Sequence, residues 1–197
     1  MELGKPDRAR GRPRTFDVEQ ALGVAQAMFH ARGYDEVGVG ELTEAMGIAA
    51  PSFYSAFGSK AGLFGKVLKR YEDLDSLPLS RILAPGRPVI DSLGELLLEA
   101  AALYAADPSR RGCLALEGAR CSDASARSAA EDASRRTGEA VRTFLRSSPS
   151  REDVADLVLV ALAGLSARSR RGMESDRLIA VARSIRPAIA ALVERDE

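Results

Sequence analysis

The most informative segment of the chain runs from residue 47 to residue 60 and reads Gly47-Ile48-Ala49-Ala50-Pro51-Ser52-Phe53-Tyr54-Ser55-Ala56-Phe57-Gly58-Ser59-Lys60. Gly47 can adopt the left-handed conformation that ends a helix. Pro51 suits the start of the next helix, where its missing N–H would have no partner anyway. Gly58 then ends this helix after barely two turns, and Ser59 can cap a further one. Such closely spaced breaks predict one short helix held at a fixed angle on the surface, which is the layout of a helix-turn-helix that reads DNA.

The rest of the 197-residue chain reads as a series of helices. Apolar residues recur at helical spacing in segments 17–33, 40–46, 51–57, 59–71, 93–104, 112–121, 125–147, 151–171 and 178–192. We find no convincing strand and no internal repeat. The sequence therefore predicts an all-α fold of about nine helices. We divide it into a basic arm over 1–14, a three-helix helix-turn-helix domain over 15–60, and a larger helical domain over 61–197.

The chain has a net charge of zero, but basic residues gather in the arm at its N-terminus. Five basic residues lie between positions 5 and 14, against the single acid Asp7; they are Lys5, Arg8, Arg10, Arg12 and Arg14. One interpretation is a solvated tail. The other is a minor-groove ligand, because Arg10-Gly11-Arg12-Pro13-Arg14 is similar to the core of an AT-hook, whose guanidinium groups enter a narrow groove.

Several classes of protein are disfavoured by what the sequence lacks. Its longest apolar run, from Leu157 to Leu165, is far too short for a membrane span, and its first residues lack a signal-peptide core. We therefore expect a cytoplasmic protein with no membrane partner. His30 is the only histidine, and we expect it at the surface or in a capping role. With no metal-binding spacing, no Gly-x-Ser-x-Gly and no phosphate loop, we expect neither an enzyme nor a cofactor.

Several motifs in order resemble the TetR/AcrR family of bacterial transcriptional repressors. These are Gly11-Arg12-Pro13-Arg14, Ala21-Leu22, Phe29, Gly33-Tyr34, Gly47-Ile48, Ser52-Phe53-Tyr54, Phe57-Gly58-Ser59-Lys60 and Leu63-Phe64. Gly112-Cys113-Leu114 and Gly164-Leu165-Ser166 resemble one branch of that family. The resemblance implies a homodimer that binds double-stranded DNA through two small domains. It also implies that residues 61–197 pair through their last two long helices and enclose the pocket of a small-molecule effector.

Carried over by position, the resemblance makes the third helix the recognition helix. Its base-facing residues would be Ala49, Ala50, Pro51, Ser52, Ser55 and Ala56. Tyr54 would donate its hydroxyl to a phosphate, and Lys60 would lie on the DNA backbone at a helix N-terminus, where an anion is favoured. Phe53 and Phe57 would point into the core.

The chain also departs from the family pattern. Gly38-Val39-Gly40 stands where a Ser or Thr cap is usual, and Gly62 replaces the usual Glu after Ser59. No Arg, Asn or Gln lies between Pro51 and Phe57, so the recognition helix has few side chains that can read bases. We therefore expect affinity to depend on phosphate contacts and on the arm formed by Arg10, Arg12 and Arg14.

The effector pocket is harder to predict. Residues that could line it are Leu97, Tyr104, Cys113, Leu116, Arg120 and Phe144, although each could equally be plain core. Cys113 and Cys121 are either small buried residues or, for Cys113, a thiol sensor whose thiolate is favoured by the start of a helix. Pro187 falls inside the last apolar pattern and should kink that helix or restart it there.

These observations favour a ligand-responsive, dimeric DNA-binding repressor acting on a palindromic operator. The alternative is a helical adaptor whose basic arm binds RNA or an acidic protein partner. A gel shift with the chain's own upstream region would separate the two.

Overall fold

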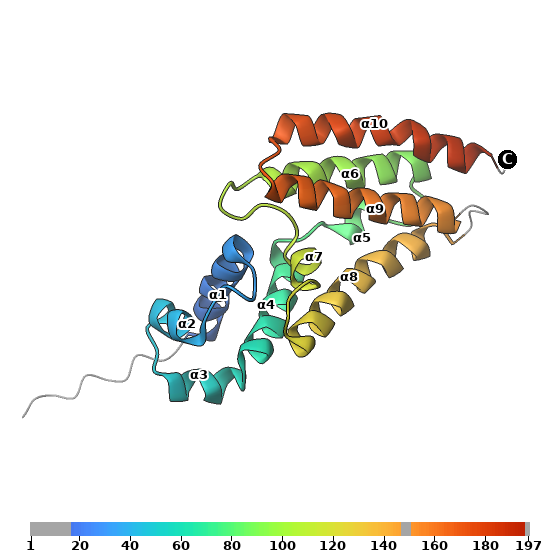
Figure 1. Cartoon of the computed structure of the whole chain (residues 1–197). Coiled ribbons are helices and arrows are strands. Elements are labelled where there is room, and N and C mark those ends of the chain that lie inside the picture. Colours follow the sequence, from blue (N-terminus) through green and yellow to red (C-terminus); the bar gives the residue numbers. More distant parts are fainter. Residues whose placement is uncertain (1–16, 147–150, 196–197) are drawn as a thin grey trace, which may run out of the picture.

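A computed structural model describes residues 17–146 and 151–195, which form helices joined by turns (Figure 1). The helices are α1 (Val18–Arg32), α2 (Val39–Met46), α3 (Ala50–Phe57), α4 (Lys60–Leu74), α5 (Leu79–Ile82), α6 (Val89–Ala105), α7 (Leu114–Gly118), α8 (Ala124–Phe144), α9 (Arg151–Arg170) and α10 (Ser175–Glu194). The predicted all-α class is confirmed. The described part contains one helix more than expected because α5 is a single turn of four residues, too short to show a periodic pattern.

The ends of the N-terminal helices follow from the capping residues that the sequence indicated. The Asp17 carboxylate accepts the backbone N–H groups of Glu19 and Gln20 at the start of α1. Ser59 Oγ accepts the Gly62 N–H, 2.9 Å away, at the start of α4. Each bond satisfies a backbone donor that a helix leaves unpaired in its first turn.

The first hydrophobic core lies where α1, α2, α3 and α4 meet α7 and α8. Its centre is an aromatic cluster in which the Phe64 ring lies 5.1 Å from the rings of both Phe29 and Tyr34. Leu114 and Ala130, from α7 and α8, belong to the same core. Packing is therefore continuous across residue 60, and the boundary that we place there remains a prediction.

The second core lies among α6, α9 and α10, which stack together in the upper part of Figure 1, with contributions from α5 and α8. Leu96, Leu97, Val158 and Leu178 are fully buried in it. The helix α4 packs in the first core along its length, from Leu63 to Tyr71, and near its C-terminal end Glu72 binds Arg136 of α8.

The last helix continues through Pro187 and does not restart there. Proline removes one backbone N–H and crowds the carbonyl four residues earlier, which belongs to Arg183. Both residues are exposed, so water can reach the groups left without a helical partner.

Candidate DNA-binding surface and effector cavity

The turn between α2 and α3 is set by Gly47, whose φ of 66° and ψ of 34° are left-handed. Its N–H donates to the carbonyls of Glu44 and Thr43, and the Ile48 N–H donates to the Thr43 carbonyl at 3.0 Å. These bonds close α2 and turn the chain sharply into α3. Pro51 occupies the second position of α3, one later than predicted, since Ala49 is the capping residue.

One face of α3 is buried and the opposite face is exposed to solvent. Phe53 and Phe57 are 0% and 5% exposed, and their rings meet at 5.4 Å in the first core. Tyr54 is 52% exposed. Of the other residues that we expect at the bases, Ala49 is exposed before the helix begins, whereas Ala56 is half-buried against the first core. Ala50, Pro51, Ser52 and Ser55 are exposed like Tyr54. The structure thus brings these five together on one outward face, which two buried phenylalanines hold in place.

Lys60, which we also expect at the DNA, contacts another side chain in this structure. Its Nζ lies 4.0 Å from the centre of the Tyr34 ring, a cation–π geometry. The Tyr34 hydroxyl in turn donates to Asp123 at 3.2 Å. The Lys60 ammonium therefore already has one partner in the free protein. Arg10, Arg12 and Arg14 lie outside the described residues.

The capping residue of α2, Gly38, has no side chain to bond to the first turn, but Glu41, three residues later, binds the backbone of Gly38. The Glu41 carboxylate accepts the Gly38 N–H at 2.9 Å and a hydrogen bond from Arg32 at 2.7 Å. Both bonds lower the pKa of Glu41, the Arg32 bond most. The Gly38 N–H therefore already has a partner and is not available to a phosphate.

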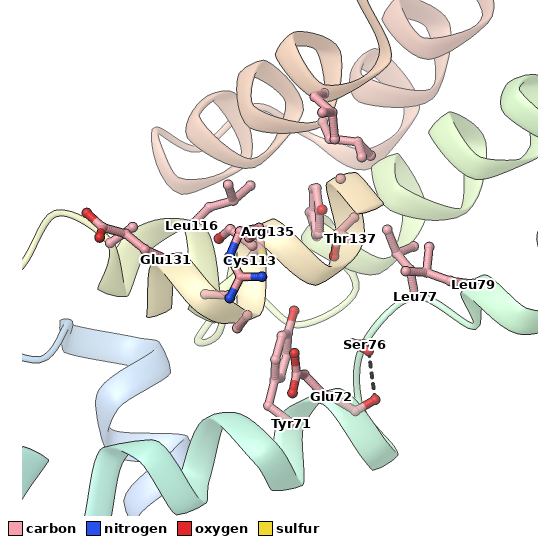
Figure 2. A pocket seen from close by; sticks show the side chains of 18 of the residues that line it. Tyr71, Glu72, Ser76, Leu77, Leu79, Cys113, Leu116, Glu131, Arg135 and Thr137 are labelled. Atoms are coloured by element: carbon pink, nitrogen blue, oxygen red, sulfur yellow. Dashed lines mark hydrogen bonds between the residues drawn. The ribbon is translucent and has the colours of Figure 1, made fainter. Parts of the chain in front are cut away.

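A cavity of about 430 Å³ lies between the C-terminal half of α4, α7 and α8, and it also reaches α5, α6 and α9 (Figure 2). Of the residues predicted to line it, Tyr104, Cys113 and Leu116 do so. Leu97 lies fully buried in the second core, Arg120 is exposed just after α7, and Phe144 borders a separate hollow beside α5. These three are not brought to the cavity.

Sequence reasoning missed most of the cavity wall. Tyr71, Glu72, Ser134 and Thr137 line it, and Figure 2 shows Tyr71 rising from α4 towards Cys113. Tyr71 ends the apolar pattern of segment 59–71, which predicts a buried position, and it is 4% exposed. The pattern alone could not distinguish a face that packs against a helix from one that borders a hollow.

Hydrogen bonds around Gly112 connect α1 to the loop before α7 and to the end of α9. We call these contacts the joint, and His30 is part of it. His30 is buried, so the expected surface position was wrong. Its Nε2 donates to the Gly112 carbonyl at 3.0 Å, and its ring meets that of Tyr71 edge-on at 5.7 Å. Burial lowers the pKa of His30, although the Gly112 bond opposes this. Arg170, at the end of α9, donates to the carbonyls of His30 and Arg111.

The environment of Cys113 differs from the one that would favour a thiolate. Burial raises the pKa of its thiol, and α7, which begins after it, has only five residues. The hydroxyls of Tyr71 and Tyr104 both hydrogen-bond to this thiol. Burial raises the pKa of the Cys121 thiol as well. Both cysteines are free.

No group of three or more His, Cys, Asp or Glu side chains in ranges 17–146 and 151–195 is arranged to hold a metal ion. Within the same ranges, no helix combines the length and apolarity needed to cross a bilayer.

Comparison with known proteins matches this geometry. A family model described as "Bacterial regulatory proteins, tetR family" matches residues 21–67, from α1 into α4. The HTH-type transcriptional repressor BdcR of Escherichia coli (strain K12) is 40% identical over 196 residues, which are 98% of this chain and 100% of BdcR. The HTH-type transcriptional repressor ComR of the same organism is 44% identical over 66 residues, 34% of this chain and 31% of ComR.

Among solved structures, a cysteine mutant of the TetR family transcriptional regulator CifR superimposes with a TM-score of 0.82 at 31% identity. The match covers 90% of this chain and 99% of CifR, which was solved with a 26bp double-strand operator DNA. A relative 40% identical along nearly the whole chain, with the family's DNA-binding segment matched in α1–α4, shows that this protein belongs to the TetR family of bacterial regulatory proteins.

Proposed function

We propose that this protein is a ligand-responsive transcriptional repressor that binds a pseudo-palindromic operator as a homodimer. The main support for this proposal is the outward face of α3. Tyr54, Ser52 and Ser55 are exposed on it, while Phe53 and Phe57 anchor the helix in the core. BdcR is named a transcriptional repressor, and CifR was solved on operator DNA. As a family regulator the protein is not an enzyme, and because it acts on DNA we place it in the cytoplasm.

Dimerisation is supported by apolar and small residues exposed on the last two helices. On α9, Val160 is 71% exposed and Gly164 follows one turn later. On α10, Ala188 and Ala191 are exposed. Pairing these faces would bury them and place two α3 helices in successive major grooves, about 34–36 Å apart.

Affinity is proposed to come mainly from phosphates, because serine, alanine and proline side chains on α3 offer few specific contacts to bases. Tyr54 would donate to a phosphate, Lys60 would turn from Tyr34 to the DNA backbone, and Arg10, Arg12 and Arg14 would enter the minor groove. Deleting residues 1–14 tests the arm. Each lost phosphate contact should lower the slope of log affinity against log salt by about 0.9, whereas an unchanged slope rules the arm out.

The cavity is proposed to hold the effector. Its wall includes α4, which begins directly after the α3 turn, and Tyr71, which touches His30 of α1. A ligand that fits only one arrangement of these helices would favour dimers whose α3 helices no longer match the operator. Tyr104, Cys113 and Leu116 remain our proposed contacts, now joined by Tyr71.

The decisive experiment is a fluorescence-anisotropy titration of the purified protein against DNA from upstream of its own gene. We expect salt-dependent binding of one dimer, competed by the intact palindrome and not by a palindrome with both half-sites mutated. Sedimentation should show a dimer. Equal competition by both DNAs, or preferred binding of RNA or an acidic protein, would instead support the adaptor.

A further inference from the structure

Three of the four charged side chains on the cavity wall are already paired with other residues. Glu72 accepts two hydrogen bonds from Arg136, at 2.8 and 2.9 Å. Arg142 pairs with Glu152 and Asp156. A third wall residue, Arg135, pairs with two acids of its own helix, at 2.7 and 2.8 Å, and a fourth, Glu131, is exposed. The wall thus contains two acids and two bases, and three of them are already compensated.

The buried polar groups on the wall are neutral. The Tyr71 and Tyr104 hydroxyls meet at the Cys113 thiol, and burial raises the pKa of all three groups. Most of the remaining wall is aliphatic, from Leu77, Leu116 and Leu162 among others. A charged ligand would lose its hydration here without gaining a buried counter-charge.

One wall residue has an unused hydrogen-bonding group. Among the described residues, the Oγ atoms of Ser134 and Ser92 are the two buried side-chain oxygens or nitrogens with no hydrogen-bond partner. Ser134 lies on α8 in the wall of the cavity, whereas Ser92 lies on α6 and does not border it. A buried hydroxyl without a partner is unfavourable, so rotation of the Ser134 side chain to place its Oγ against a ligand oxygen in the cavity would be favoured.

We propose that the effector is an uncharged, mainly aromatic or aliphatic molecule whose single alcohol or carbonyl oxygen hydrogen-bonds to Ser134. This inference rests on the proposed function of the cavity. Its apolar skeleton lies against the leucines and the tyrosine rings. A carboxylate or ammonium ion of the same shape is disfavoured, because Glu72, Arg135 and Arg142 are already paired. The remaining wall charge, Glu131, is exposed to water, which weakens its attraction for an ion.

Three probes that share one skeleton test the charge requirement: 2-naphthylmethanol, 2-naphthoate and 2-naphthylmethylammonium. Binding to the full chain is measured by isothermal titration calorimetry at pH 7.5, with operator binding measured in parallel. We expect the alcohol to bind at least about tenfold more tightly than either ion, since burying an uncompensated charge is costly. Equal or tighter binding of an ion, or no binding of any probe, overturns the proposal.

Ser134→Ala tests the contact, and Ser92→Ala is its matched control. Each removes a buried hydroxyl that has no partner, so each should raise the unfolding temperature of the free protein. Only Ser134→Ala should weaken binding of the alcohol, by roughly fivefold for one lost hydrogen bond. Equal effects of the two variants on binding would overturn the role of Ser134. Failure of wild-type protein to bind operator would instead overturn the proposed function, whatever the probes do.

Discussion

Replacing Gly112 by alanine tests the joint between the DNA-binding helices and the cavity. Gly112 has a φ of +82°, and a Cβ built on it would lie 2.7 Å from Arg170 Cγ and 3.0 Å from Ser166 Oγ. Arg170 cannot move away freely, because its guanidinium donates to the carbonyls of His30 and Arg111. Ser166 Oγ is equally held, since it accepts the Cys113 N–H at 2.9 Å.

The cost of this change has two parts that a control can separate. A left-handed conformation costs alanine about 1–2 kcal/mol, and overpacking a filled site costs about 1–3 kcal/mol. Gly86 has a φ of +80° but nothing within 4 Å of its built Cβ. Gly86→Ala should therefore lower the free energy of unfolding by the first amount alone. Gly112→Ala should lower it by about 2–5 kcal/mol.

The assay is equilibrium unfolding in urea, followed by circular dichroism at one fixed protein concentration because dimer stability depends on concentration. The slope against urea should stay constant so that the midpoints report stability. If Gly112→Ala is no more destabilising than Gly86→Ala, then Arg170 and Ser166 yield without cost and our account of a rigid joint is wrong.

Three further predictions follow from exposure and ionisation. Tyr54→Phe removes a neutral donor to a charged phosphate, so it should weaken operator binding by about tenfold or more. The slope of log affinity against log salt and the unfolding midpoint should stay unchanged. A wild-type affinity would show that Tyr54 does not contact the DNA. Folding lowers the pKa of His30, so below about pH 6.5 the unfolded chain binds more protons than the folded chain. The free energy of unfolding should therefore fall as the pH drops below that value. His30→Gln, measured in urea at pH 7.5 and 5.5, should show a smaller fall than wild type. Cys113 should react with iodoacetamide at pH 7.5 more slowly than a free peptide thiol, since its pKa is raised. Mass spectrometry of labelled peptides measures the rate. Faster labelling would support the thiol-sensor hypothesis for Cys113.

The helix-turn-helix was predictable because local chemistry specifies it. A left-handed glycine at 47, a proline early in the next helix and a serine cap at 59 act within one or two turns of their own positions. The alternation of Phe53 and Phe57 with Tyr54 likewise assigns the two faces of α3 from helical periodicity alone. These are short-range effects, and the sequence contains all the groups that produce them.

The cavity and the joint depend instead on how helices distant in sequence cross. Leu97 and Tyr104 lie two turns apart on α6, yet one is core and the other borders the cavity. His30 is buried because the loop at Gly112, more than eighty positions later in the chain, covers it. Helical spacing tells which face of a helix is apolar but not what lies opposite that face. That is decided only when the helices pack, since packing determines whether an apolar face meets another helix, an aromatic ring or a hollow.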